Sequence, residues 1–219
     1  MSRRESTVVG FVVGILCPAS FFVLWWWVAA ALSHYRVLPI PESGIAIAAF
    51  TGLGIGIVLD IFHLKKWITR FYNADVKLII LVYLFWSVIA VALFMGLPFG
   101  NLALGILAGL YVGRKQYHAG ASEDYFTKAA RNVSIFTALV TSVEALPIGL
   151  GALSEAVVAQ ALRSVVGLDQ SATAGSVGVV LVGAVCVALL MVQFWCTRTA
   201  AVLAFSSRNV HKQNRLSAS

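Results

Sequence analysis

Long apolar segments recur along this chain, and their length restricts the fold more than any other feature. A helix needs about 20 apolar residues to cross the hydrocarbon core of a bilayer. Six segments meet or approach this length. They cover approximately residues 8–32, 43–63, 78–97, 101–113, 132–153 and 176–204. The sequence therefore predicts an all-α integral membrane protein of about six transmembrane helices, forming one polytopic domain over residues 1–219.

The composition supports the same class. Hydrophobic residues make up 60% of the chain, charged residues only 11%, and the mean hydropathy is +0.89. Soluble domains are about one quarter charged. A water-soluble fold would leave much of this apolar surface exposed, which soluble monomers do not tolerate. Membrane lipids are therefore the first partners that the sequence predicts.

The N-terminus imitates a secretory signal peptide, because Arg3 and Arg4 precede an apolar run that ends near three alanines. That run covers residues 8–32, whereas the apolar part of a signal peptide has about 7–15 residues. The aromatic cluster Trp25–Trp27 is typical of a helix end at the membrane interface. We expect the run to be retained as the first span.

The basic residues are distributed unevenly between the loops. In a six-span topology, Arg36 and Arg163 lie on one side and the other fourteen lysines and arginines on the opposite side. Basic residues concentrate on the cytoplasmic side of membrane proteins. The pattern predicts a multi-pass protein of the cell (inner) membrane with both termini in the cytoplasm. It also accounts for the net charge of +7 without nucleic acid as a partner.

Four further features complete the predicted topology. Residues 154–167 have apolar side chains on one side of a helix, which predicts a short amphipathic helix on the outer face or a short re-entrant segment. The sixth segment is longer than one span requires, so it either tilts or breaks near Arg198. Residues 205–219 form a polar C-terminal tail. On the inner side, Ser122 followed by two acidic residues predicts a helix start before the fifth span.

Small residues recur at four-residue spacing along the second and fourth segments. This spacing forms a stripe on one helix face, which allows two helix backbones to approach closely. We predict that four of these glycines lie at helix contacts: Gly52, Gly56, Gly105 and Gly109. Two interpretations remain open. The stripes either provide tight packing of a general kind, or they join the second and fourth segments as a parallel pair with Asp60 on its seam.

Asp60 lies about one turn from the cytoplasmic end of the second segment. A carboxylate at this depth is either an interfacial group paired with a cation or a functional gate or coupling-ion ligand. Arg198 is the natural partner for an ion pair, because it lies at a similar depth in the sixth segment.

Glu144 is the strongest candidate for function, because it falls near the middle of the fifth segment. An acidic residue there costs about 2.5–3.5 kcal/mol on insertion scales, and a functional role is the default hypothesis. Ser134, Thr137 and Thr141 share its helix face by their 3, 4, 3 spacing. Pro147 can free a backbone carbonyl nearby. The alternative is a structural glutamate, with hydroxyls that bond to their own helical turn.

Signatures of enzymes, metal sites and cofactors are missing from the sequence. It contains no G-x-S-x-G, no H-E-x-x-H and no P-loop. The three cysteines lie inside apolar segments, and the histidines lie at or beyond segment ends, so neither is placed to hold a metal. We expect no cofactor, and any ATP would be hydrolysed by another chain.

The sequence thus favours membrane transport of a small solute or ion, or the substrate-binding membrane subunit of a transport complex. The substrate- or ion-binding face would comprise Glu144, Thr141, Thr137 and Ser134, with Asp60 as a cytoplasmic gate. Two alternatives remain: an intramembrane enzyme acting on lipid head groups, and a non-catalytic scaffold or assembly subunit. In each case the glycine stripes could contact a second copy of the chain or partner membrane subunits.

Overall fold

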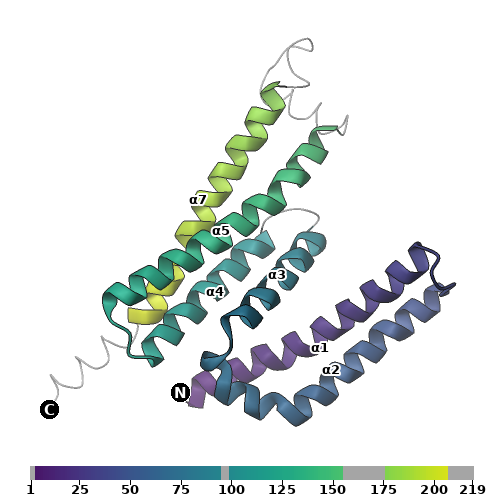
Figure 1. Ribbon diagram of the computed structural model, residues 1–219, viewed down its shortest axis with the longest axis horizontal. Helices are drawn as coiled ribbons and strands as arrows, with labels where there is room; N and C mark the ends of the chain where they lie inside the picture. The colour runs from purple at the N-terminus through teal and green to yellow at the C-terminus, as the bar shows by residue number, and fades with distance from the viewer. Residues whose placement is uncertain (1–2, 95–98, 155–175, 207–219) are drawn as a thin grey trace. The chain divides into compact units, whose positions relative to one another are not determined.

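A computed structural model describes residues 3–94, 99–154 and 176–206 of the 219-residue chain. Within these ranges the protein is helical and contains no strand, so the predicted all-α class is confirmed for them (Figure 1). Five of the described helices are long and apolar enough to cross a membrane. These helices are compatible with the predicted multi-pass membrane protein.

The fourth predicted span is the helix that is missing from those five. Helix α4 covers Phe99–His118, so it begins two residues before the predicted fourth segment and ends five residues after it. Its last turns carry Arg114, Lys115 and Gln116, and its first turn carries Asn101. These polar residues lower its hydropathy, although its 20 residues have the length of a span. The transmembrane character of α4, and with it the total of six spans, therefore stays a prediction.

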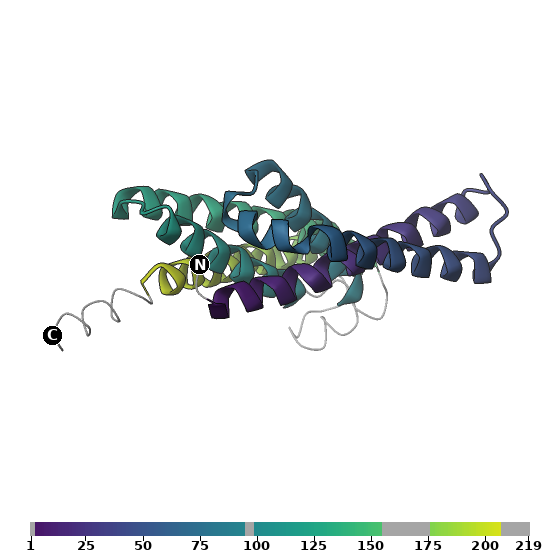
Figure 2. The ribbon, with the colours of Figure 1, turned by 90° about the horizontal axis from the view of Figure 1, so that it is seen from below.

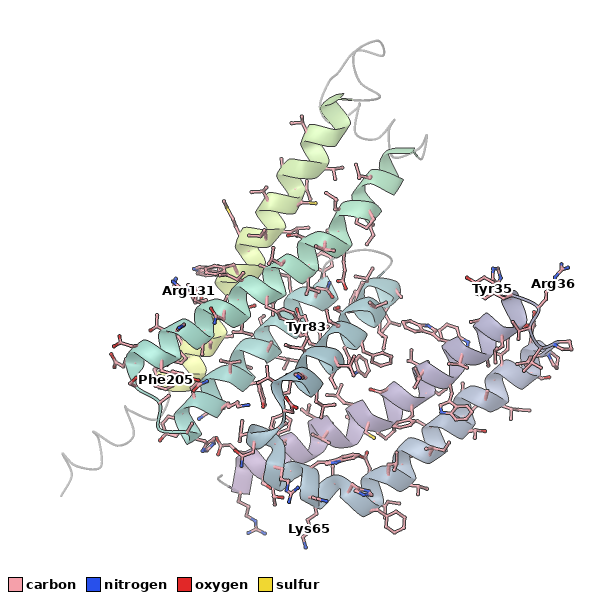
Figure 3. All side chains as sticks on the ribbon, viewed as in Figure 1. Tyr35, Arg36, Lys65, Tyr83, Arg131 and Phe205 are labelled. Carbon is pink, nitrogen blue, oxygen red and sulfur yellow. The ribbon has the colours of Figure 1, made fainter. Side chains whose placement is uncertain are left out.

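The chain divides into two compact units, Met1–Ala74 and Asp75–Ser219. The first unit is a helical hairpin of α1 (Arg3–His34) and α2 (Glu42–Arg70), followed by the short 3-10 helix η1 (Phe71–Asn73). Figure 2 shows α1 and α2 side by side along much of their length. Tyr35 and Arg36 lie at the turn between them (Figure 3).

Two glycines of α2 bring the hairpin helices into backbone contact. A Cβ atom on Gly52 would lie 2.5 Å from the carbonyl oxygen of Phe21, and one on Gly56 would lie 2.5 Å from the Cα of Pro18. Both glycines are buried, as is Ala49 on the same side of α2. Only residues without a side chain allow α1 and α2 to approach this closely.

The second unit consists of α3 (Val76–Leu93), α4, α5 (Glu123–Ser154) and α7 (Ser176–Ser206). Asp75 caps α3 by accepting a hydrogen bond from the backbone N–H of Lys77 at 3.0 Å. Helix α5 begins at Glu123, as the acidic residues after Ser122 predict. Helix α7 is continuous through Arg198, so of the two possibilities for the sixth segment, the break is wrong.

Helix α7 packs against both α4 and α5, while α3 packs against α4 and α5. The glycine stripe of α4 faces α7. A Cβ atom on Gly109 would collide with the carbonyl oxygen of Thr197, and one on Gly113 with that of Ala201. At the end of the unit where α5 begins, the rings of Phe126 and Phe205 stack with centroids 4.0 Å apart (Figure 3).

The glycine contacts correct one interpretation of the sequence. The parallel pairing of the second and fourth segments through their glycines is wrong, because the stripe of α2 packs on α1 and that of α4 packs on α7. Small residues specify a close helix contact but not the partner, since any helix with a suitable ridge can fill the groove.

Two other predictions concern parts of the chain outside the described residues. Nearly all of the amphipathic helix predicted for residues 154–167 falls in the range 155–175, and the polar tail falls largely in 207–219. Both stay predictions.

Candidate functional site

Glu144 is held by hydrogen bonds from two other helices. The hydroxyl of Ser87 on α3 lies 2.7 Å from its Oε1 and shares its proton between this oxygen and the carbonyl of Leu84, 2.9 Å away, while the amide nitrogen of Asn101 on α4 donates to its Oε2. Both donors are buried, whereas Glu144 itself is half-buried. An ionised carboxylate only accepts hydrogen bonds, so two donors, one for each oxygen, suit it well. The contact ties α3, α4 and α5 together at one point.

A second layer of bonds extends this polar centre to α7. The side-chain amide of Gln193 donates to the backbone carbonyl of Asn101 at 3.0 Å. Gln193 is fully buried and lies against Gly105, whose missing side chain provides the space for it. A Cβ atom at Gly105 would overlap the Gln193 amide. Gly105 therefore serves the polar centre as well as helix packing.

The predicted hydroxyl stripe of α5 is buried, and its members differ in their bonding. Ser134 donates to the carbonyl of Ala130 at 2.8 Å, and Thr141 donates to that of Thr137 at 3.0 Å. These are the local bonds expected if the stripe is structural. Thr137 differs, because its hydroxyl also lies 3.0 Å from that of Thr197 on α7. Among the described residues, Thr137 is the one member of the stripe whose hydroxyl is bonded to another helix.

Three polar atoms of this region are buried without a hydrogen-bond partner among the described residues. They are Oδ1 of Asn101, Oε1 of Gln193 and the hydroxyl of Tyr83, which lies on α3 (Figure 3). A buried acceptor without a partner costs about 1–3 kcal/mol. Native proteins leave few such atoms, and each one calls for an explanation such as a bound water or ion.

Asp60 lies in the first unit, on the same side of α2 as the close-packed glycines. It is only 7% exposed, and its Oδ1 has no hydrogen-bond partner among the described residues. Asp60 also lines a groove of about 440 Å³ with residues of α1 and α2, among them Gly14, Pro18 and Lys65. Arg198 is exposed on α7 of the second unit, and its predicted pairing with Asp60 stays a prediction.

The sequence drew attention to Glu144 but missed its two donors. Ser87 is an isolated polar residue in an apolar segment, and Asn101 lies at the start of another. A signal was nevertheless present, because Asn101 lies four residues before Gly105 and so continues the glycine stripe of α4. A polar residue on a close-packed face is buried with that face. The four-residue pattern could therefore have identified Asn101.

Comparisons with known proteins give no assignment for this arrangement. No protein-family model, no curated protein and no solved structure matches the chain.

Proposed function

We propose that this chain transports a small solute or ion across a membrane, or forms the substrate-binding membrane subunit of a transport complex. The observation that supports this proposal is the placement of Glu144. It lies within an apolar helix of spanning length, and its two oxygens are oriented by donors from α3 and α4. Ionisable groups inside membranes are costly, and those that face a bundle interior commonly mark substrate or ion pathways.

Pro147 removes one intrahelical hydrogen bond in the same stretch of α5. It lies inside the helix, and having no N–H it cannot donate to the carbonyl of Val143, one residue before Glu144. A free carbonyl in a membrane span requires another partner, which a substrate, a water or a cation can provide. The free carbonyl of Val143 and the carboxylate of Glu144 lie at the same depth of α5, and together they favour a binding point for a substrate or a cation there.

The proposal is tested by the substitution Glu144→Gln in the purified full-length chain, reconstituted in vesicles. Glutamine keeps the shape of glutamate but removes its charge. We expect the flux of radioactive sodium, or of protons reported by a pH-sensitive dye, to fall at least about tenfold, which corresponds to 1.4 kcal/mol. The yield of folded protein should remain close to that of the wild type.

The matched control is Glu123→Gln, the same chemical change at an exposed position of the same helix. It should leave flux unchanged. If Glu144→Gln transports as the wild type does, or if Glu144→Leu raises the melting temperature without loss of flux, Glu144 is a dispensable structural group and the proposal fails.

The proposed topology places both termini in the cytoplasm. A cysteine introduced at Ser43, near the start of α2, should react with an impermeant thiol reagent added from outside intact cells. One introduced at Ser122, before α5, should not react until the membrane is permeabilised. Both positions are exposed, so their accessibility to the reagent depends on the side of the membrane. Labelling of the Ser122 position in intact cells would show that the predicted orientation in the membrane is wrong.

A further inference from the structure

We propose that the polar centre of α3, α4, α5 and α7 binds a monovalent hard cation of the Na⁺ type. Its ligands would be the Glu144 carboxylate and the side-chain oxygens Oδ1 of Asn101 and Oε1 of Gln193. This inference rests on the proposed transport function and names the chemical class of the bound species.

The two amides are bonded in the same unbalanced way. Asn101 uses its NH₂ group to donate to Glu144, and Gln193 uses its NH₂ group to donate to the backbone of Asn101. The oxygen of each amide remains buried without a partner among the described residues. Asn101 is 2% exposed and Gln193 is fully buried, so bulk water does not satisfy these oxygens. The centre has unused acceptors, which is what a cation requires.

The charge of the centre points the same way. Within the described chain, Glu144 has neutral hydrogen-bond donors and no lysine or arginine as a partner. An unpaired charge in an apolar region is strongly unfavourable. One monovalent cation would neutralise one carboxylate, whereas a divalent cation would leave a net positive charge. The balance therefore selects a monovalent ion.

The ligand types agree with a hard cation. Carboxylate and amide carbonyl oxygens are the ligands that hard cations take in proteins, while soft metals prefer sulfur and many transition metals prefer imidazole. Among the described residues, no group of three or more histidine, cysteine, aspartate or glutamate side chains could hold a metal ion. The unpartnered amide oxygens of Asn101 and Gln193 are further ligands of this hard type for a cation at Glu144.

The inference is tested by measuring the melting temperature of the purified full-length chain in NaCl, LiCl, KCl and choline chloride at equal ionic strength. A ligand that binds only the folded state raises its stability in a saturable way. We expect a saturable rise in NaCl that choline chloride does not reproduce. Gln193→Met, which keeps the length of the side chain but removes both the amide oxygen and the NH₂ group, should shift the sodium concentration for half-maximal effect upward at least about tenfold.

Two further variants make the result decisive. Gln116→Met is the same change at a half-buried position near the end of α4, and it should leave the sodium response unchanged. Gln193→Glu adds a second carboxylate, so it should keep the sodium response and add a response to CaCl₂. A purely structural network would lose stability in Gln193→Glu whatever cation is present. This variant also decides the matter if Gln193→Met does not fold.

The cation site and the transport function can fail separately. If NaCl and choline chloride stabilise the wild type equally, the buried oxygens bind water or nothing, and the cation site is wrong. If Glu144→Gln still abolishes flux in that case, the transport proposal stands with another substrate. If sodium stabilises the wild type but Glu144→Gln leaves flux unchanged, the site is structural and the transport proposal fails.

Discussion

Substituting Gly109 with leucine should abolish folding of the chain, and alanine at this position should already destabilise it. Even a single Cβ atom would collide with the carbonyl oxygen of Thr197 and would lie 3.1 Å from the Cβ of Ala200. Both neighbours are backbone or methyl groups of α7, and neither can rotate away. Overpacking of a well-packed core costs about 1–3 kcal/mol for small additions. The loss in Gly109→Ala should lie in this range, and Gly109→Leu should exceed it.

The measurement is the yield of monodisperse protein after size-exclusion chromatography, together with the melting temperature. Ala103→Leu is the matched control, because Ala103 lies on the same helix but is exposed. It should give wild-type yield. A wild-type melting temperature for Gly109→Leu would mean that α4 and α7 do not form this contact.

The second large effect is expected at Gly56, where α2 crosses α1. A Cβ atom there would lie 2.5 Å from the Cα of Pro18 and 3.3 Å from the carbonyl oxygen of Cys17. Gly56→Leu should force the two helices of the hairpin apart. We expect a loss of folded yield comparable with that of Gly109→Leu, since both changes place a side chain against a helix backbone.

Gly54 provides an unusually close control, because it lies two residues away on the same helix and a Cβ atom there would meet nothing within 4 Å. Leucine also has the higher helix propensity, so Gly54→Leu should be neutral or slightly stabilising. If Gly54→Leu and Gly56→Leu lower the yield equally, the damage would come from a cause other than the α1–α2 contact.

Local features of the sequence predicted the all-α class and the approximate positions of most helices. Segment length and apolarity are local properties, so they predicted α1, α2, α3, α5 and α7 without knowledge of packing. Helix α4 was harder to delimit, because its polar end residues interrupt the apolar run on which the prediction depended.

The sequence also identified Glu144, because a carboxylate in an apolar run is conspicuous whatever surrounds it. The spacing of Ser134, Thr137 and Thr141 placed them on one face of α5, and the structure buries all three. Helical periodicity alone is sufficient for such an inference, since residues three and four apart share a face.

Which helices pack together is visible only in the folded protein. The stripe of Gly105 and Gly109 could have received any close neighbour, and it receives α7. The bonds from Ser87 and Asn101 to Glu144 join residues 57 and 43 positions apart in the sequence. Periodicity determines a residue's face within its own helix, but pairing depends on the shapes of two surfaces that fit together only after folding. The partners of Glu144, and with them the unused oxygens of Asn101 and Gln193, therefore became visible only in three dimensions.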